Sequence, residues 1–207
     1  MDLGRIQNDF GRRFVSPMRG AGRRRAAFAV GPLLLILAAC GSQSTPAQSG
    51  ANLVTQGLKA QLSGDAATAK ADYQQAIALN PNNDVAHFDL GTVYDEQAQK
   101  AQAVQEYQMA LVIAPNFADA LFNLAVDTAG TNPPSAQELY SKVVSLQPSF
   151  AAAWLNLGFT LLSQGKADQA QIDWAKAIAI DPTLASRLPK ATATPSPAAS
   201  PTPKAKR

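Results

Sequence analysis

The chain has 207 residues, enough for one or two domains, and its sequence pI is about 9.1. Its charge is uneven: residues 1–39 carry +5, residues 50–184 carry −7, and residues 185–207 carry +5. Nucleic-acid binding needs Lys and Arg gathered on the folded part of a protein, so the acidic middle segment argues against it.

Residues 1–39 are predicted to be a targeting segment. Arg23-Arg24-Arg25 precede a run of 14 uncharged, mainly apolar residues, 26–39. As a helix this run would span about 21 Å. That is short of the roughly 30 Å hydrocarbon core of a bilayer, but it suits the hydrophobic region of a signal peptide. Met18 is an alternative start that would give a shorter signal of conventional length.

The apolar run ends in Leu37-Ala38-Ala39-Cys40, which resembles a bacterial lipobox. The resemblance implies cleavage after Ala39 and a thioether-linked diacylglycerol on Cys40. The alternative is a lone buried thiol. Cys40 is the only cysteine, so the chain cannot form an internal disulfide. Residues 40–49 lack charge and an apolar run, and we expect a flexible tether there.

Five columns of similar residues recur at steps of 33 or 34 between residues 50 and 184. They are Gly57, Gly91, Ala125 and Gly158; Ala69, Ala103, Ala136 and Ala170; Tyr73, Tyr107, Tyr140 and Trp174; Ala76, Ala110, Val143 and Ala177; and Pro81, Pro115, Pro148 and Pro182. This period and these residue types resemble the tetratricopeptide repeat (TPR) family. The resemblance implies an all-α fold, an α-solenoid of four helix-turn-helix repeats at 50–83, 84–117, 118–150 and 151–184.

The repeated residues are expected to form the core. Small residues let the two helices of a repeat approach, and aromatic residues fill the space between neighbouring repeats. The motif positions so assigned are Gly57, Tyr73, Gly91, Tyr94, Tyr107, Tyr140, Trp154, Gly158 and Trp174. Asp84 is a candidate N-cap. Repeat three is one residue short and carries Ala125 and Thr128 where Gly and Tyr are usual, which predicts looser stacking there.

Residues 185–207 form a basic tract rich in Pro, Ala, Thr and Ser, expected to be disordered. It offers no good candidate for the solvating helix that usually follows the last repeat. Ile172, Ile178 and Ile180 are therefore predicted to be incompletely covered, unless all three pack inward on repeat four.

Catalytic and metal-binding patterns are missing from the sequence. The single histidine, His87, falls in a bulky column and is expected to pack rather than to bind a ligand. There is no His/Cys cluster and no Gly-rich phosphate loop. We expect no enzymatic activity, no cofactor and no metal.

The TPR resemblance places partner binding on the first helix of each repeat. The residues it selects are Val54, Leu58, Val85, Phe88, Thr92, Asp119, Phe122, Val126, Leu155 and Phe159. No Lys or Arg stands at these positions, and Asn123 and Asn156 are the only remnants of a carboxylate clamp. We expect an apolar groove that binds an amphipathic helix or apolar peptide, although some of these residues could instead be buried between helices.

Three functions fit these patterns. The first is a lipid-anchored scaffold for protein partners in a bacterial cell envelope, on the extracytoplasmic face of the cell membrane, or of an outer membrane where the source has one. The second is a structural protein that forms homo-oligomers through its last helix. The third is a TPR adaptor held by an uncleaved signal anchor. The lipobox and tether favour the first two.

Overall fold

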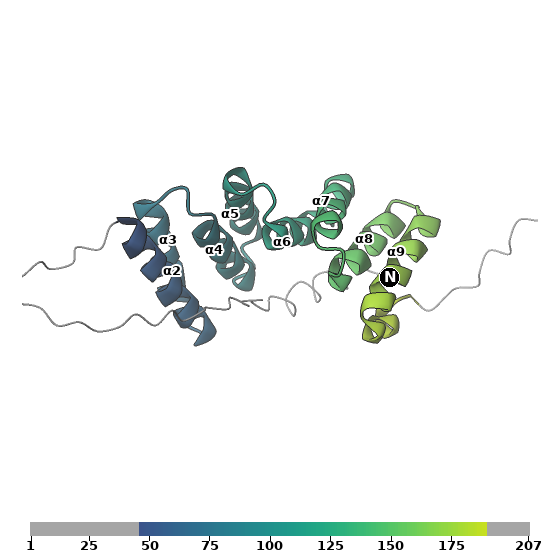
Figure 1. Ribbon diagram of the computed structural model, residues 1–207, viewed down its shortest axis with the longest axis horizontal. Coiled ribbons are helices and arrows are strands. Elements are labelled where there is room, and N and C mark those ends of the chain that lie inside the picture. The colour runs from purple at the N-terminus through teal and green to yellow at the C-terminus, as the bar shows by residue number, and fades with distance from the viewer. Residues whose placement is uncertain (1–45, 190–207) are drawn as a thin grey trace, which may run out of the picture.

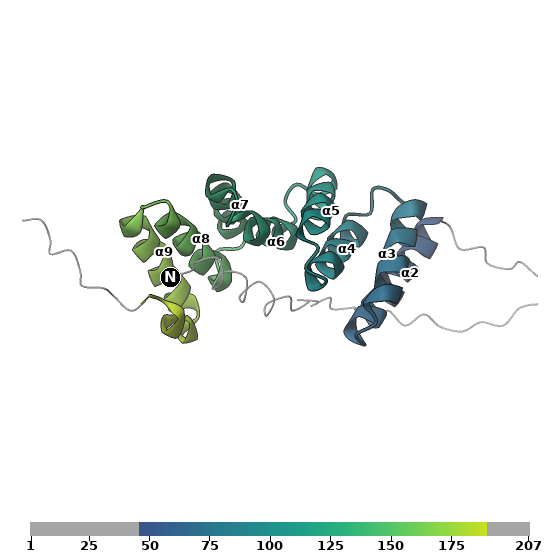
Figure 2. The ribbon, with the colours of Figure 1, turned by 180° about the vertical axis from the view of Figure 1, so that it is seen from behind.

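The computed structural model describes residues 46–189, and all regular structure in that range is helical. The elements are α2 (Pro46–Leu62), α3 (Ala66–Leu79), α4 (Asp84–Glu96), α5 (Lys100–Ile113), α6 (Ala118–Thr128), α7 (Pro133–Leu146), α8 (Ala151–Ser163), α9 (Ala167–Ile180) and the 3-10 helix η1 (Pro182–Arg187). The helices follow one another in a row from α2 and α3 at one end to α8 and α9 at the other (Figures 1 and 2).

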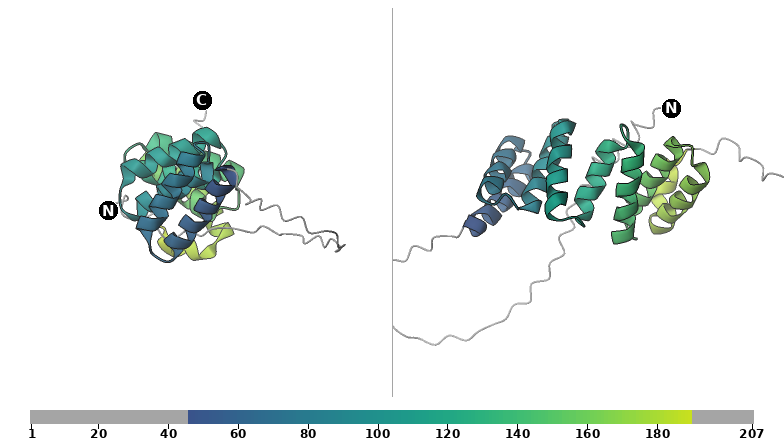
Figure 3. Two further views of the ribbon diagram at one scale, coloured as in Figure 1. Left: turned by 90° about the vertical axis from the view of Figure 1, so that its left-hand side faces the viewer. Right: turned by 90° about the horizontal axis from the view of Figure 1, so that it is seen from above.

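The predicted α-solenoid is confirmed. Each repeat is one helix pair, and the second helix of each pair also packs against the first helix of the next. Figure 3 shows the row from above and from its end. None of the helices within residues 46–189 is long and apolar enough to cross a membrane. The targeting segment, the lipobox with Cys40, and residues 190–207 of the basic tail lie outside the described residues.

The ends of the helical array differ from the predicted limits. α2 begins at Pro46, inside the segment expected to be a tether, because a proline at the first helical position forfeits no hydrogen bond. At the other end η1 runs to Arg187, and its Leu184 is buried in the core. Residue 184 is therefore not a sharp limit, and part of the last helix is covered. Ile172 and Ile180 remain exposed.

In repeats one, two and four a glycine lies against the aromatic residue of the second helix. A Cβ atom built on Gly91 would lie 2.6 Å from Cε1 of Tyr107, and one built on Gly57 would lie 2.7 Å from Cε1 of Tyr73. Both tyrosines are fully buried. This close approach is the one expected from the small-residue column.

Side-chain caps begin several helices. Asp65 accepts from the backbone N–H of Thr68 at 3.0 Å, and Asn83 accepts from that of Ala86 at 3.1 Å. The cap of α4 is thus Asn83, and the prediction of Asp84 is wrong. Asp84 is instead the first helical residue, where its negative charge interacts favourably with the positive end of the helix dipole.

The buried apolar side chains form two clusters that meet between repeats two and three. One cluster extends from Val54 to Leu124, and the other from Leu121 to Leu184. Leu111 and Leu139 are partly buried and pack against both clusters. The two clusters therefore meet at α6, which contributes Leu121 to one and Leu124 to the other.

Candidate protein-binding face

The first helices α2, α4, α6 and α8 carry all ten residues predicted to bind a partner, which we call the first-helix face. The structure buries five of them: Val54, Thr92, Phe122, Leu155 and Phe159. The ring of Phe122 lies 4.8 Å from that of Phe150 and 5.8 Å from that of Tyr140. These five residues therefore do not line an open groove, as the alternative of burial between helices allowed, and neighbouring aromatic rings cover Phe122.

The covering residues form a column that was not recognised from the sequence. Phe117, Phe150 and Leu184 each lie two residues after a repeat proline, at steps of 33 and 34. Phe117 packs against Phe88 with 4.8 Å between ring centroids. The apolar column is nevertheless present in the sequence, and it marks the side chains that close over the first helix of the preceding repeat.

The other predicted residues keep some exposure. Leu58, Val85, Phe88 and Val126 are half-buried. Asp119 is exposed to solvent, yet protein atoms crowd its carboxyl group and burial raises its pKa. An apolar contact surface thus persists on α2, α4 and α6, although it is smaller than predicted.

Polar side chains tie the first helices of repeats one and two together. The Gln61 amide donates to Oγ1 of Thr92 at 3.2 Å and to Oε1 of Glu96 at 2.7 Å. Gln61 Oε1 in turn accepts from the Tyr73 hydroxyl at 3.0 Å. Gln61 therefore links the buried column of its own repeat to the surface of the next one.

A second network spans the junction between repeats two and three. The Tyr107 hydroxyl donates to Oδ2 of Asp95 at 2.8 Å and accepts from the Asn123 amide at 3.2 Å. Lys100 Nζ lies 3.2 Å from Oδ1 of Asp127, whose side chain is 4% exposed. Desolvation, followed by repulsion from Asp127, raises the pKa of Asp95 to about 7. The junction therefore holds two carboxyl groups next to a single lysine.

The two asparagines predicted as clamp remnants have a structural role in the folded chain. Asn123 and Asn156 are buried, and each donates to the hydroxyl of the tyrosine in the preceding second helix, Tyr107 at 3.2 Å and Tyr140 at 3.4 Å. The amide nitrogens of both residues are therefore used within the protein, whereas the buried Oδ1 of Asn156 has no hydrogen-bond partner among residues 46–189.

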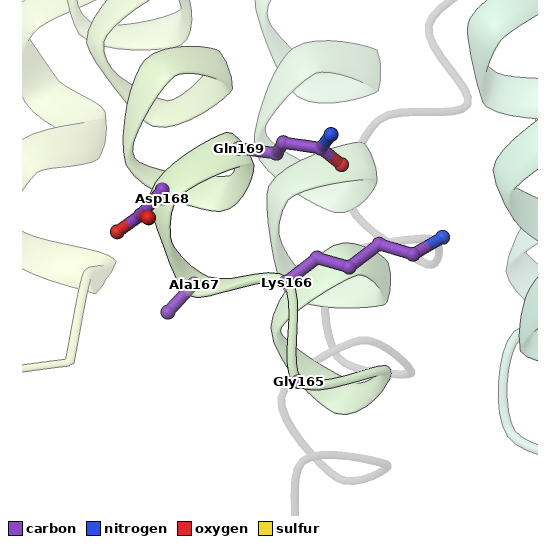
Figure 4. A pocket seen from close by; sticks show the side chains of 5 residues that line it. All are labelled: Gly165, Lys166, Ala167, Asp168 and Gln169. Carbon is purple, nitrogen blue, oxygen red and sulfur yellow. The ribbon is translucent and has the colours of Figure 1, made fainter.

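A shallow hollow at the turn between α8 and α9 is lined by residues 165–169. Figure 4 shows that the side chains of Lys166 and Gln169 point away from that of Asp168, so they do not converge on a common ligand. Within residues 46–189 no three His, Cys, Asp or Glu side chains are grouped to hold a metal ion. The predicted absence of enzymatic activity and cofactors stays a prediction.

Two family models of the tetratricopeptide repeat match the chain, one at residues 72–105 and 139–172 and the other at residues 60–83. These matches fall on the repeats seen in the structure. The chain contains tetratricopeptide repeats. Solenoids built from such repeats present an extended surface on which other proteins can bind.

Curated relatives match part of the chain. The chain is 26% identical over 125 residues to human "Protein O-mannosyl-transferase TMTC3", covering 53% of the chain and 14% of that protein. It is 34% identical over 74 residues to human "Tetratricopeptide repeat protein 6", covering 36% of the chain and 14% of that protein. The chain therefore spans a small part of both relatives.

Solved structures show the same fold. "Crystal structure of MamA" has a TM-score of 0.60 at 22% identity, over 66% of this chain and 81% of that one. PilF of Pseudomonas aeruginosa has a TM-score of 0.61 at 21% identity, over 69% and 65%. The first TPR of Spaghetti (RPAP3), bound to an HSP90 peptide, has a TM-score of 0.56 at 18% identity, over 60% and 99%. At these identities the likeness concerns the fold alone.

Proposed function

We propose that this chain is a lipid-anchored TPR scaffold that gathers protein partners at the extracytoplasmic face of a bacterial membrane. The anchor is supported by sequence: a basic run, an apolar segment and Leu37-Ala38-Ala39-Cys40 follow in the order of a lipoprotein signal. The scaffold role is supported by the TPR fold. Two or more acyl chains would hold the protein firmly, where one alone is marginal.

The partner-binding part of the proposal rests on the first-helix face as the structure presents it. Leu58, Val85, Phe88 and Val126 offer half-buried apolar contacts, and Asp119 and Glu96 are exposed carboxylates on the same helices. These positions carry no Lys or Arg to clamp an acidic peptide terminus. We therefore propose an apolar or helical segment with basic flanking residues as the partner.

The anchor is tested by Cys40→Ser in the native host. We expect the mature protein to lose its lipid by mass spectrometry and to leave the membrane fraction. An unchanged mature mass and an unchanged membrane fraction would overturn the anchor while leaving the scaffold role standing.

The partner face is tested with charge-reversal variants, whose capture of partner proteins is measured by crosslinking in native membranes. Asp119→Lys combined with Glu96→Lys should reduce partner capture several-fold, because both carboxylates lie on the first helices. Glu138→Lys, an exposed reversal on the second helix α7, is the matched control and should leave capture unchanged. Equal capture by both variants would contradict the proposed face.

Self-association through the last helix is the second candidate, because Ile172 and Ile180 of α9 are 58% and 40% exposed. It predicts a concentration-dependent dimer of residues 41–207 in size-exclusion chromatography. Ile172→Glu should abolish that dimer. A monomer at all concentrations would remove this candidate.

A further inference from the structure

His87 is the only histidine of the chain, and both of its ring nitrogens face oxygen acceptors. The residue is buried on α4. Nδ1 lies 2.7 Å from Oε2 of Glu106 on α5, and Nε2 lies 3.1 Å from the carbonyl oxygen of Pro81 in the turn before α4. A carboxylate and a carbonyl oxygen can only accept. Each ring nitrogen therefore makes its hydrogen bond only when it carries a hydrogen.

The fourth repeat supplies an internal reference for the Nε2 bond. Trp154 precedes Gly158 by four residues, as His87 precedes Gly91. The indole Nε1–H of Trp154 donates to the carbonyl oxygen of Pro148 at 2.8 Å. An indole nitrogen is a donor only. The equivalent contact in repeat two is a hydrogen bond only when Nε2 of His87 carries a hydrogen, and Nδ1 then faces Glu106.

Repeat four also has an acidic residue at the position equivalent to Glu106, and there a lysine neutralises it. Asp173 and Glu106 each precede the aromatic residue of the second helix by one position. Asp173 pairs with Lys176 at 3.0 Å, and the Lys176 ammonium lies 3.9 Å from the centroid of the Trp154 ring.

In repeat two the position of that lysine is Met109, which is uncharged. Among the described residues, the one cation paired with Glu106 is therefore His87 itself, when its ring carries two hydrogens.

We propose that the doubly protonated His87 ring holds α4 against α5 and against the turn before α4, through its hydrogen bonds to Glu106 and to the Pro81 carbonyl. Repeat two is then a pH-sensitive element of the solenoid. With only one ring hydrogen, one of two contacts loses its donor: Nδ1 faces Oε2 of Glu106 at 2.7 Å, or Nε2 faces the carbonyl oxygen of Pro81 at 3.1 Å. Both hydrogen bonds are thus present when the His87 ring carries two hydrogens, and one of them is lost as the pH rises.

The surroundings of the ring define which charges act on it. From α5 the facing charged group is Glu106, and within the described range neither α2 nor α3 gives the ring a hydrogen bond or ion pair. On α4 itself, Asp84 lies three residues earlier. The positive end of the α4 dipole opposes a charge on His87, but this effect is weaker than a short charge-assisted hydrogen bond.

The test compares the full-length chain with a variant that gives repeat two the arrangement of repeat four. His87→Trp with Met109→Lys keeps Glu106, restores a donor to Pro81, and supplies a permanent cation. Between about pH 5.5 and about pH 8.5, the melting temperature of the unmodified chain should fall by about 3–6 °C more than that of the variant. Asp95 also titrates in this range, but it is common to both proteins and cancels in the difference.

Identical pH dependence of the two melting temperatures would overturn the proposal. Nuclear magnetic resonance gives a second readout that does not depend on the variant. Because the chain has one histidine, its two imidazole ¹⁵N signals are unambiguous. When both contacts are hydrogen bonds, both nitrogens should carry a hydrogen, and Glu106→Gln should change the Nδ1 signal while a Met109→Leu control should not. An Nδ1 without a proton throughout the folded range would also overturn the proposal.

Discussion

Gly91→Ala is a sharp test of the packing within a repeat. The added Cβ would lie 2.6 Å from Cε1 and 2.8 Å from Cδ1 of Tyr107, well inside van der Waals contact. Tyr107 cannot retreat freely, because it is fully buried and its hydroxyl bonds to Asp95 and Asn123. Overpacking typically costs about 1–3 kcal/mol. Each weakened hydrogen bond adds about 0.5–1.5 kcal/mol.

The higher helix propensity of alanine offsets about 1 kcal/mol of that loss. The net loss of unfolding free energy is therefore about 1–5 kcal/mol, and at about 2–4 °C per kcal/mol it lowers the melting temperature by at least about 2 °C. Urea and thermal unfolding followed by circular dichroism measure it. Gly130→Ala is the matched control, because no atom lies within 4 Å of its added Cβ. If Gly91→Ala were as stable as the unmodified chain, the close approach of Gly91 to the Tyr107 ring would not contribute to stability.

The backbone of one turn and the junction between repeats two and three give two further predictions. Ala98 has a φ of 59° where the equivalent turns carry Gly64 and Gly165, so Ala98→Gly should stabilise the fold by about 0.5–1 kcal/mol in urea titrations, and a loss would contradict the assigned strain. Asp95 has a folded pKa raised to about 7, so its stabilising contribution is complete in acid and is lost as the pH rises through 7. Asp95→Asn keeps an acceptor for Tyr107. Between pH 5 and pH 8 the stability of this variant should rise by about 1–2 kcal/mol relative to the unmodified chain, a figure reduced for the partial solvation of the carboxyl. An equal pH dependence of the two proteins would show that the Asp95 carboxyl does not destabilise the fold when it ionises.

The solenoid could be predicted from the sequence because each repeat column reports one packing contact. Gly91 and Tyr107 recur in step with their counterparts, and the structure places them against each other. The ends were predicted less well. α2 extends to Pro46 and η1 covers the last repeat, because terminal helices are set by local capping and contact rather than by the repeat pattern.

The binding face was harder to predict because exposure depends on neighbouring repeats. Phe122 and Phe159 stand at family binding positions, but Phe150 covers the first and Trp174 lies against the second. The recurrence of Phe117 and Phe150 in the sequence does not by itself show which helix these side chains pack against. The pairing of His87 with Glu106 was likewise hidden, since the two residues are 19 positions apart.

The division of the core into two clusters has a consequence for local unfolding. In a solenoid each repeat contacts only its neighbours, so stability is a sum of repeat and interface contributions. The clusters meet at α6, where Leu121 belongs to one and Leu124 to the other, and Leu111 of α5 and Leu139 of α7 pack against both. One half of the solenoid could therefore lose its packing while the other half keeps its own core.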